Sequence, residues 1–127
     1  STLIETRRDM IEKKPDVVQR FVNASVTGWY NYLYGDNTAA NARIKRDNPE
    51  MSDALIAYSI AKMKEYGIVD SGDTLKDGIG AMNDARMASF FDTMVRAGVV
   101  RRDIDFRQAY TLRFVNKGVG LDLRPKN

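Results

Sequence analysis

The 127-residue chain contains neither cysteine nor histidine. This absence excludes disulfide bonds, thiolate nucleophiles, imidazole bases and metal sites built on thiolate or imidazole ligands, and it leaves the redox compartment undetermined. No apolar run approaches the roughly 20 residues that span a bilayer. Residues 1–14 are charged and lack the apolar segment of a signal peptide. We therefore expect either a cytoplasmic protein or a chain whose natural N-terminus lies outside this sequence.

The chain also lacks a strong excess of charge of one sign, because 20 basic and 17 acidic residues leave a net charge of +3. Nucleic-acid-binding domains usually gather their basic residues on one face. Here the basic clusters are interleaved with acids, at Arg7–Arg8, Lys13–Lys14, Arg43–Arg46 and Arg101–Arg102. We interpret them as solvated surface and expect no nucleic-acid partner. Weak binding through basic helix ends is the alternative, and it would fall steeply with salt.

What is present is an ordinary hydrophobic fraction of 43%, which is typical of a folded domain. A chain of this length can form one domain with a core, and no linker or internal repeat divides it. The most strongly specified element is the stretch from Pro15 to Gly35. Pro15 fits the first position of a helix, Asp16 places a negative charge on the positive end of the helix dipole, and Gly35 can end the helix in a left-handed conformation.

The apolar positions of this central helix recur with a helical period but cover more than one side; they are Val17, Val18, Phe21, Val22, Val26, Trp29, Tyr30 and Leu33. This width predicts neighbours on more than one face. Gly28 costs about 1 kcal/mol relative to alanine inside a helix, which a close approach of another element would explain. The aromatic residues at its end, Trp29, Tyr30, Tyr32 and Tyr34, favour packing over stacking on a flat ligand, because they point in different directions.

The rest of the chain predicts a mainly α fold, with about five helical segments and one short N-terminal strand. The strand is expected at residues 2–6 and a helical turn at residues 8–13. Further helices are expected from Asp36 or Asn37 to Arg46, from Ser52 to Tyr66, from Asn83 or Asp84 to Ala97 with its apolar side chains inward, and from Asp103 to about Phe114. Residues 70–80 are expected to form a loop, and residues 117–127 an extended or loose tail.

Two charged residues are the candidate ligand-binding positions. Glu5 lies in an otherwise apolar strand, where a buried carboxylate would need a partner or a polar ligand; the alternative is an exposed edge position. Arg86 lies in the first turn of a helix, where a cation is unfavourable, which suggests pairing with Asp84 or another acid.

No arrangement in the sequence points to catalysis, a cofactor or a metal. The loop acids Asp70, Asp73 and Asp77 do not have the ligand spacing of a calcium-binding EF-hand and fit turn and cap chemistry better. Gly78-Ile-Gly lacks both the preceding strand and the third glycine of a dinucleotide fingerprint. No paired carboxylates and no nucleophile with a base stand out. We therefore expect a protein that is not an enzyme and has no catalytic residues.

Several stretches, taken in order, resemble the C-terminal part of solute-binding proteins of ABC importers, in the group that handles nitrate, sulfonates, taurine and pyrimidine precursors of thiamine. The main one is an apolar strand and helical turn followed by Pro15-Asp-Val-Val-Gln-Arg-Phe21, with Gly28-Trp29 after it. The others are Ile44 to Met51, Gly80 to Met87, Ala97-Gly98-Val99 and Asp105 to Asn116. Pyrimidine-synthesising relatives use a segment with cysteine and histidine that this chain lacks, so that activity is not implied.

The resemblance implies a two-lobed α/β parent of about twice this length, of which residues 1–127 are a partial domain of helices that coat a lobe. It implies a periplasmic or lipid-anchored protein whose signal sequence lies outside this chain. The parent would bind a small solute between its lobes, with Glu5 reaching the cleft, and would deliver it to a membrane permease. The alternative is a stand-alone helical interaction module. The unpaired strand and wide apolar helix also predict self-association of these residues.

Overall fold

The computed structural model describes residues 3–125, and every regular element in that range is helical. The elements are α1 (Arg8–Lys13), α2 (Pro15–Tyr34), α3 (Thr38–Asp47), α4 (Asp53–Glu65), α5 (Thr74–Asp77), α6 (Asp84–Arg96) and the short 3₁₀ helices η1 (Phe106–Ala109) and η2 (Leu121–Leu123). The mainly α fold class is therefore confirmed. Among the helices of residues 3–125, none combines the length and apolar character needed to cross a membrane.

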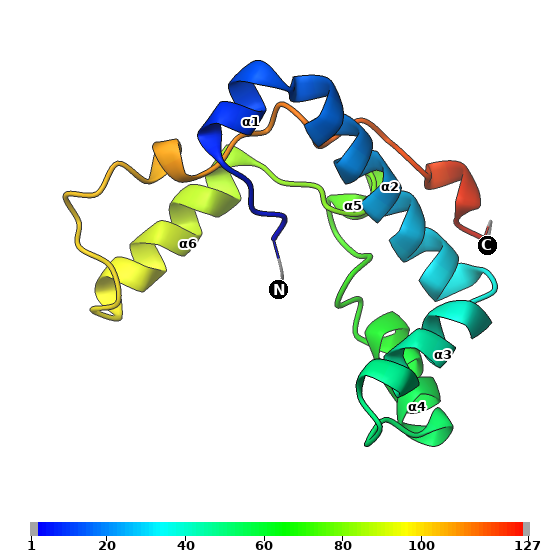
Figure 1. Ribbon diagram of the computed structural model, residues 1–127. Helices are drawn as coiled ribbons and strands as arrows, with labels where there is room; N and C mark the ends of the chain where they lie inside the picture. Colours follow the sequence, from blue (N-terminus) through cyan, green and yellow to red (C-terminus); the bar gives the residue numbers. More distant parts are fainter. Residues whose placement is uncertain (1–2, 126–127) are drawn as a thin grey trace.

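The helices are arranged openly around α2 (Figure 1). The short α1 leads into the start of α2, α3 and α4 lie beyond its other end, and α6 extends away on the opposite side of the molecule with η1 beside it. The C-terminal segment runs back along α2, and η2 contacts it. Most of the packing therefore takes place along one helix.

The sequence signals that define α2 act largely as expected. Pro15 begins the helix and Asp16 lies in its first turn. Gly35 ends the helix by donating its N–H to the Asn31 carbonyl at 2.8 Å. The predicted left-handed conformation of Gly35 is wrong, because its φ of −107° is ordinary extended backbone. The helix ends here since Asp36 and Asn37 turn the chain into α3, and the Asp36 carboxylate accepts the Thr38 N–H at 2.9 Å.

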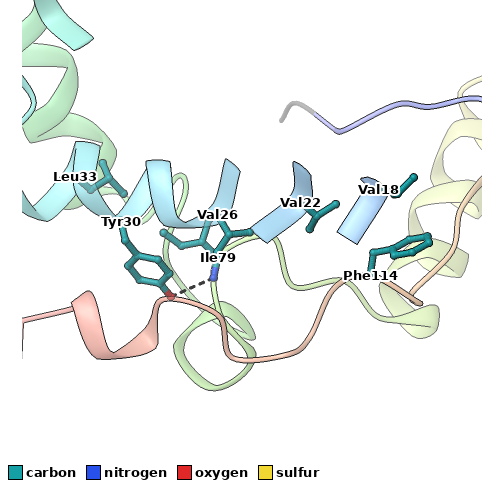
Figure 2. Packing of buried hydrophobic residues seen from close by; sticks show 7 residues of the cluster. All are labelled: Val18, Val22, Val26, Tyr30, Leu33, Ile79 and Phe114. Carbon is teal, nitrogen blue, oxygen red and sulfur yellow. Dashed lines mark hydrogen bonds between the residues drawn. The ribbon is translucent and has the colours of Figure 1, made fainter. Parts of the chain in front are cut away.

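The core lies along one face of α2 (Figure 2). Val18, Val22, Val26, Tyr30 and Leu33 are buried there at helical spacing, and Ile79 and Phe114 pack against them from later in the chain. Tyr30 is fully buried, and its hydroxyl accepts the Ile79 N–H at 3.2 Å. This bond satisfies a backbone donor that burial would otherwise leave unpaired.

The predicted strand at residues 2–6 is wrong over its described part. Residues 3–7 have no regular structure and are exposed, and residue 2 lies outside the described residues. No strand in the described part of the chain is available to pair with this segment, and an isolated strand cannot satisfy its backbone groups.

The predicted helix from Asp103 to Phe114 shortens to the single turn of η1. The backbone becomes extended at Tyr110, so Phe106 can stack on Phe91 of α6 while Phe114 reaches the core beside α2. The predicted loop over residues 70–80 contains one helical turn, α5. In both segments, residues 103–114 and 70–80, the structure differs from the prediction made from local sequence alone.

The C-terminal tail is not loose over its described part, residues 117–125. Gly118 donates its N–H to the Asp77 carbonyl at 3.0 Å, and Leu121 to Leu123 form η2 against α2. Gly120 approaches the ring of Tyr30 so closely that an added Cβ would lie 2.5 Å from Cδ2. Only a glycine fits between η2 and α2 at this point.

The predicted caps of α4 and α6 are confirmed, but the packing of α6 is not as expected. Ser52 Oγ accepts the Leu55 N–H at 3.2 Å, and Asn83 Oδ1 accepts the Arg86 N–H at 2.7 Å. The apolar side chains of α6 were expected to point inward, yet no residue of α6 is buried. The reason is the open arrangement, in which the described elements cover the apolar face of α6 only in part.

We predict that Gly120→Ala destabilises the protein more than Gly72→Ala does. Both glycines have a positive φ, 75° and 60°, which costs an alanine about 1–2 kcal/mol. Only Gly120 also faces a clash, with the Tyr30 ring, which should add about 1–3 kcal/mol. Chemical denaturation followed by circular dichroism measures both. Equal losses for the two variants would show that η2 does not press on Tyr30.

Candidate functional site

Glu5, the first predicted ligand-binding residue, lies in the exposed segment before α1. The reasoning that gave it a special role required a buried strand, and the described residues contain none. Its carboxylate forms no hydrogen bond or ion pair within residues 3–125. In this structure Glu5 is a solvated side chain.

Arg86, the second predicted residue, is exposed in the first turn of α6. Its backbone N–H is held by the Asn83 cap, but no carboxylate of the described residues forms the expected ion pair with its guanidinium. Asp84, the expected partner, instead accepts a hydrogen bond from the Tyr110 hydroxyl at 2.5 Å. No hydrogen bond or ion pair joins the side chains of Arg86 and Glu5 in the described part of the chain.

The most elaborate polar cluster surrounds Asp70 and Arg124. Two guanidinium nitrogens of Arg124 donate to the Asp70 carboxylate at 2.6 and 2.8 Å. The same carboxylate accepts the hydroxyls of Tyr34 at 2.8 Å and Thr74 at 2.7 Å. The side chain of Asp70 is only 3% exposed and that of Arg124 20%. The cluster therefore joins α2, the segment before α5 and the C-terminal tail.

The hydrogen bonds of this cluster hold segments of the chain together. Arg124 also donates hydrogen bonds to the carbonyls of Thr74 and Leu75 and to the Tyr30 hydroxyl. Burial alone would raise the pKa of the Asp70 carboxyl, but the hydrogen bonds from Arg124, Thr74 and Tyr34 outweigh burial and lower this pKa. Burial and the bond to Asp70 also raise the pKa of Tyr34. Each of these side chains therefore has a hydrogen-bond partner inside the cluster.

The loop acids do not assemble a metal site. Asp70 is occupied by Arg124, Asp73 accepts a hydrogen bond from the side chain of Asn83, and the Asp77 carbonyl pairs with Gly118. Within residues 3–125, no three acidic side chains gather closely enough to hold a metal ion. The turn and cap interpretation is wrong for Asp73, whose side chain makes no cap hydrogen bond at the start of α5, and it misses the main partner of Asp70, which is Arg124, 54 residues away.

An uncovered apolar stripe runs along α2 on a side that faces away from the core. It comprises Val17, Phe21, Ala24 and Gly28, which follow one another at helical spacing and are all exposed. The exposed fractions of Val17 and Phe21 are 41% and 61%. We call these four residues the outer stripe of α2. The predicted second face of this helix is thus present, but no described element covers it.

The expected close approach at Gly28 is wrong for the described residues, because a Cβ added there meets no heavy atom within 4 Å. The aromatic end of α2 is divided between packing and exposure. Tyr30 is in the core as the packing interpretation predicts, while Trp29 lies edge-on to Tyr32 at a centroid distance of 6.1 Å and is 37% exposed.

A second apolar surface, only partly covered, is the face of α6 formed by Met87, Phe90, Phe91, Met94 and Val95. Phe106 stacks on Phe91 with a centroid distance of 4.6 Å and covers one flank of this face. Phe90 remains 59% exposed. The other four residues are half-buried, so Phe90 is the exposed part of this face.

Sequence reasoning missed Arg124 altogether. It lies in a glycine-rich tail that carries no periodic pattern, and its partner Asp70 is 54 residues away. The only signal was the presence of an arginine beyond the last predicted helix, which identifies no partner.

The chain matches none of the protein-family models, none of the curated proteins and none of the solved structures with which it was compared.

We predict that Asp70→Asn lowers the free energy of unfolding at neutral pH by about 2–3 kcal/mol, because it removes a charged partner of Arg124. The lowered pKa of Asp70 means that its contribution is complete above the unfolded pKa of about 3.9 and is lost as the pH falls through the folded pKa. The difference from the unmodified protein should therefore shrink in acid.

The measurement is urea denaturation as a function of pH. The control is Asp122→Asn, which changes an exposed carboxylate of the same tail and should alter stability little. A loss for Asp70→Asn that does not change between neutral and strongly acidic pH would contradict the assignment of this loss to the ionised carboxylate.

Proposed function

We propose that this chain is the C-terminal part of the substrate-binding component of an ABC importer, which captures a small solute and delivers it to a membrane permease. The resemblance of the stretches from Pro15 to Asn116 suggests this class. The observation that supports it is the outer stripe of α2. A helix that is apolar on two sides, with a core on one and nothing on the other, has the character of a helix placed between a local core and a further layer.

In this proposal the further layer is a sheet of the parent lobe, contributed by residues beyond this chain. The proposed solute belongs to the nitrate, sulfonate, taurine and pyrimidine group, and the parent is periplasmic or lipid-anchored and is not an enzyme. Glu5 and Arg86 are the proposed contacts to the solute. Both side chains are exposed, which is compatible with a cleft formed by other parts of the parent.

A stand-alone helical interaction module is the second candidate function. The partly covered apolar face of α6, with Phe90 59% exposed, favours it, because a Phe- and Met-rich helical face is a common docking surface for a partner. In that case the surfaces of α2 and α6 bind other proteins directly. The genomic context of the coding sequence separates the two proposals.

We predict that the reading frame continues upstream of Ser1 and encodes another α/β lobe preceded by a signal sequence. The complete protein should gain thermal stability with one of nitrate, taurine, an alkyl sulfonate or a pyrimidine, by about 2.7 kcal/mol at a hundredfold excess over Kd. A thermal-shift screen measures this. An open reading frame that starts near Ser1 would contradict the proposal.

A substitution at Gly28 provides a second test. In the 127-residue chain, Gly28→Ala should stabilise α2 by about 0.5–1 kcal/mol, because the added methyl meets nothing. In the complete parent the same change should be destabilising, because a layer packed on the outer stripe leaves no space for the methyl. Asp16→Ala, at an exposed position of α2 that lies off the outer stripe, should act alike in both proteins. Stabilisation by Gly28→Ala in the parent would argue against a layer on this stripe.

A further inference from the structure

The side chain of Arg124 lies in a pocket whose acceptors match a guanidinium group. Its Nε and Nη2 donate to the two oxygens of the Asp70 carboxylate at 2.8 and 2.6 Å. Nη1 donates to the Leu75 carbonyl at 3.0 Å, and Nη2 also donates to the Thr74 carbonyl at 3.0 Å. The guanidinium carbon lies over the Tyr30 ring, 5.7 Å from its centroid. A two-pronged carboxylate, further carbonyls and an aromatic face suit a planar guanidinium better than a compact ammonium group.

The walls of this pocket are held together by hydrogen bonds that do not involve the arginine. The hydroxyls of Tyr34 and Thr74 donate to the Asp70 carboxylate at 2.8 and 2.7 Å. The Tyr30 hydroxyl accepts the Ile79 N–H at 3.2 Å within the core, as Figure 2 shows. These bonds join α2 to the segments on both sides of α5. The acceptors of the pocket are therefore positioned independently of the side chain that fills it.

The segment that carries the arginine is attached lightly. Residues 117–125, which we call the C-terminal strap, run along α2 (Figure 1), and no residue of the strap is buried. Among the described residues, one backbone hydrogen bond joins the strap to the rest of the chain, from the Gly118 N–H to the Asp77 carbonyl at 3.0 Å. The strap also packs through Gly120 on the Tyr30 ring. The ion pair of Arg124 is therefore the main polar attachment at the end of the strap.

The charge in the pocket creates a demand for a cation. The side chain of Asp70 is only 3% exposed. A buried carboxylate that loses its cationic partner is strongly unfavourable, because neither water nor a second charge replaces the lost interaction. A pocket with fixed acceptors and a buried negative charge therefore attracts another guanidinium group when the strap leaves.

We propose that the pocket around Asp70 is a guanidinium-binding site, that Arg124 occupies it as an internal ligand, and that a guanidinium group from another molecule takes this place when the strap detaches. The C-terminal strap is then an autoinhibitory contact that closes the site in the isolated chain. The ligand is either the arginine side chain of a peptide segment or a small guanidinium compound, which share the same chemistry.

This site is independent of the proposed transport function, because it uses the core side of α2 and not the outer stripe. A parent that binds none of the proposed solutes would overturn the transport function and leave the guanidinium site unaffected. Failure of the experiments below would overturn the guanidinium site and leave the transport function unaffected.

Arg124→Ala empties the pocket, and ethylguanidinium at tens of millimolar is the probe that refills it. Urea denaturation should show that the probe stabilises Arg124→Ala, with about a twofold rise in the ratio of folded to unfolded chain when its concentration equals its Kd. The unmodified chain should gain less, because Arg124 already fills its pocket. Ethylammonium should stabilise neither chain, because it lacks the planar set of donors. No response, or an equal response to both cations, would overturn the proposal.

Two further variants test whether the response belongs to this pocket. Arg113→Ala removes an exposed arginine whose contact with the Ile11 carbonyl is long, at 3.5 Å, and ethylguanidinium should stabilise it no more than the unmodified chain. Asp70→Asn combined with Arg124→Ala should lose the response of Arg124→Ala, because the buried charge is gone. A double variant that still responds fully would overturn the proposal.

The same experiment remains decisive for an Arg124→Ala chain that is unfolded in buffer. Ethylguanidinium should then restore its helical circular dichroism, and ethylammonium should not. Failure of ethylguanidinium to restore the helical signal would overturn the proposal.

Hydrogen exchange tests whether the strap separates from the pocket as a unit. In Arg124→Ala, the Gly118 amide should exchange faster than in the unmodified chain, while the amides of Val22 and Val26 in the core face of α2 stay protected. Equal loss of protection at Gly118 and along α2 would overturn the role of the strap as a detachable segment.

The two sources of the guanidinium group are separated by a capped leucyl-arginine dipeptide. A peptide source predicts that the dipeptide stabilises Arg124→Ala at a lower concentration than ethylguanidinium does. Equal or weaker action of the dipeptide supports a small guanidinium compound as the ligand of the same site.

Discussion

The buried side chain of Tyr30 is the point on which the described fold depends. Its ring lies in the core face of α2 and against the backbone of Gly120, and its hydroxyl accepts hydrogen bonds from the Ile79 N–H and from Arg124. Three segments that are far apart in the sequence therefore meet on one residue. Because each polar group there has a partner, the tail and the loop before it adopt defined positions on α2 without a sheet or a second layer.

The boundaries of the helices were largely predictable because their signals are local. Pro15 and Ser52 mark helix starts through backbone geometry and side-chain capping, which depend on a few neighbouring residues. The strand at residues 2–6 and the long helix after Asp103 were wrong for the opposite reason. A strand depends on a partner elsewhere, and the break at Tyr110 depends on where Phe106 and Phe114 pack.

The candidate sites also divide into features that local sequence predicts and features that depend on distant residues. The interpretation of α2 as a helix with two apolar sides follows from spacing alone, and the outer stripe is where the pattern places it. Glu5 and Arg86 were selected because each would violate a local rule if buried or unpaired, yet both are exposed, where solvent removes the conflict. The pair of Asp70 and Arg124 could not be inferred, since neither residue carries a sign of the other in the sequence.

The lack of any buried residue in α6 has a consequence for how the protein opens. Local opening of a segment costs the free energy of the contacts that it breaks, and α6 would break little beyond the stack of Phe91 on Phe106 and the bond between Asp84 and Tyr110. Its amide protons should exchange with solvent well before those of α2 around Tyr30. We therefore expect a slowly exchanging unit along α2 and a second, more readily opened unit at α6.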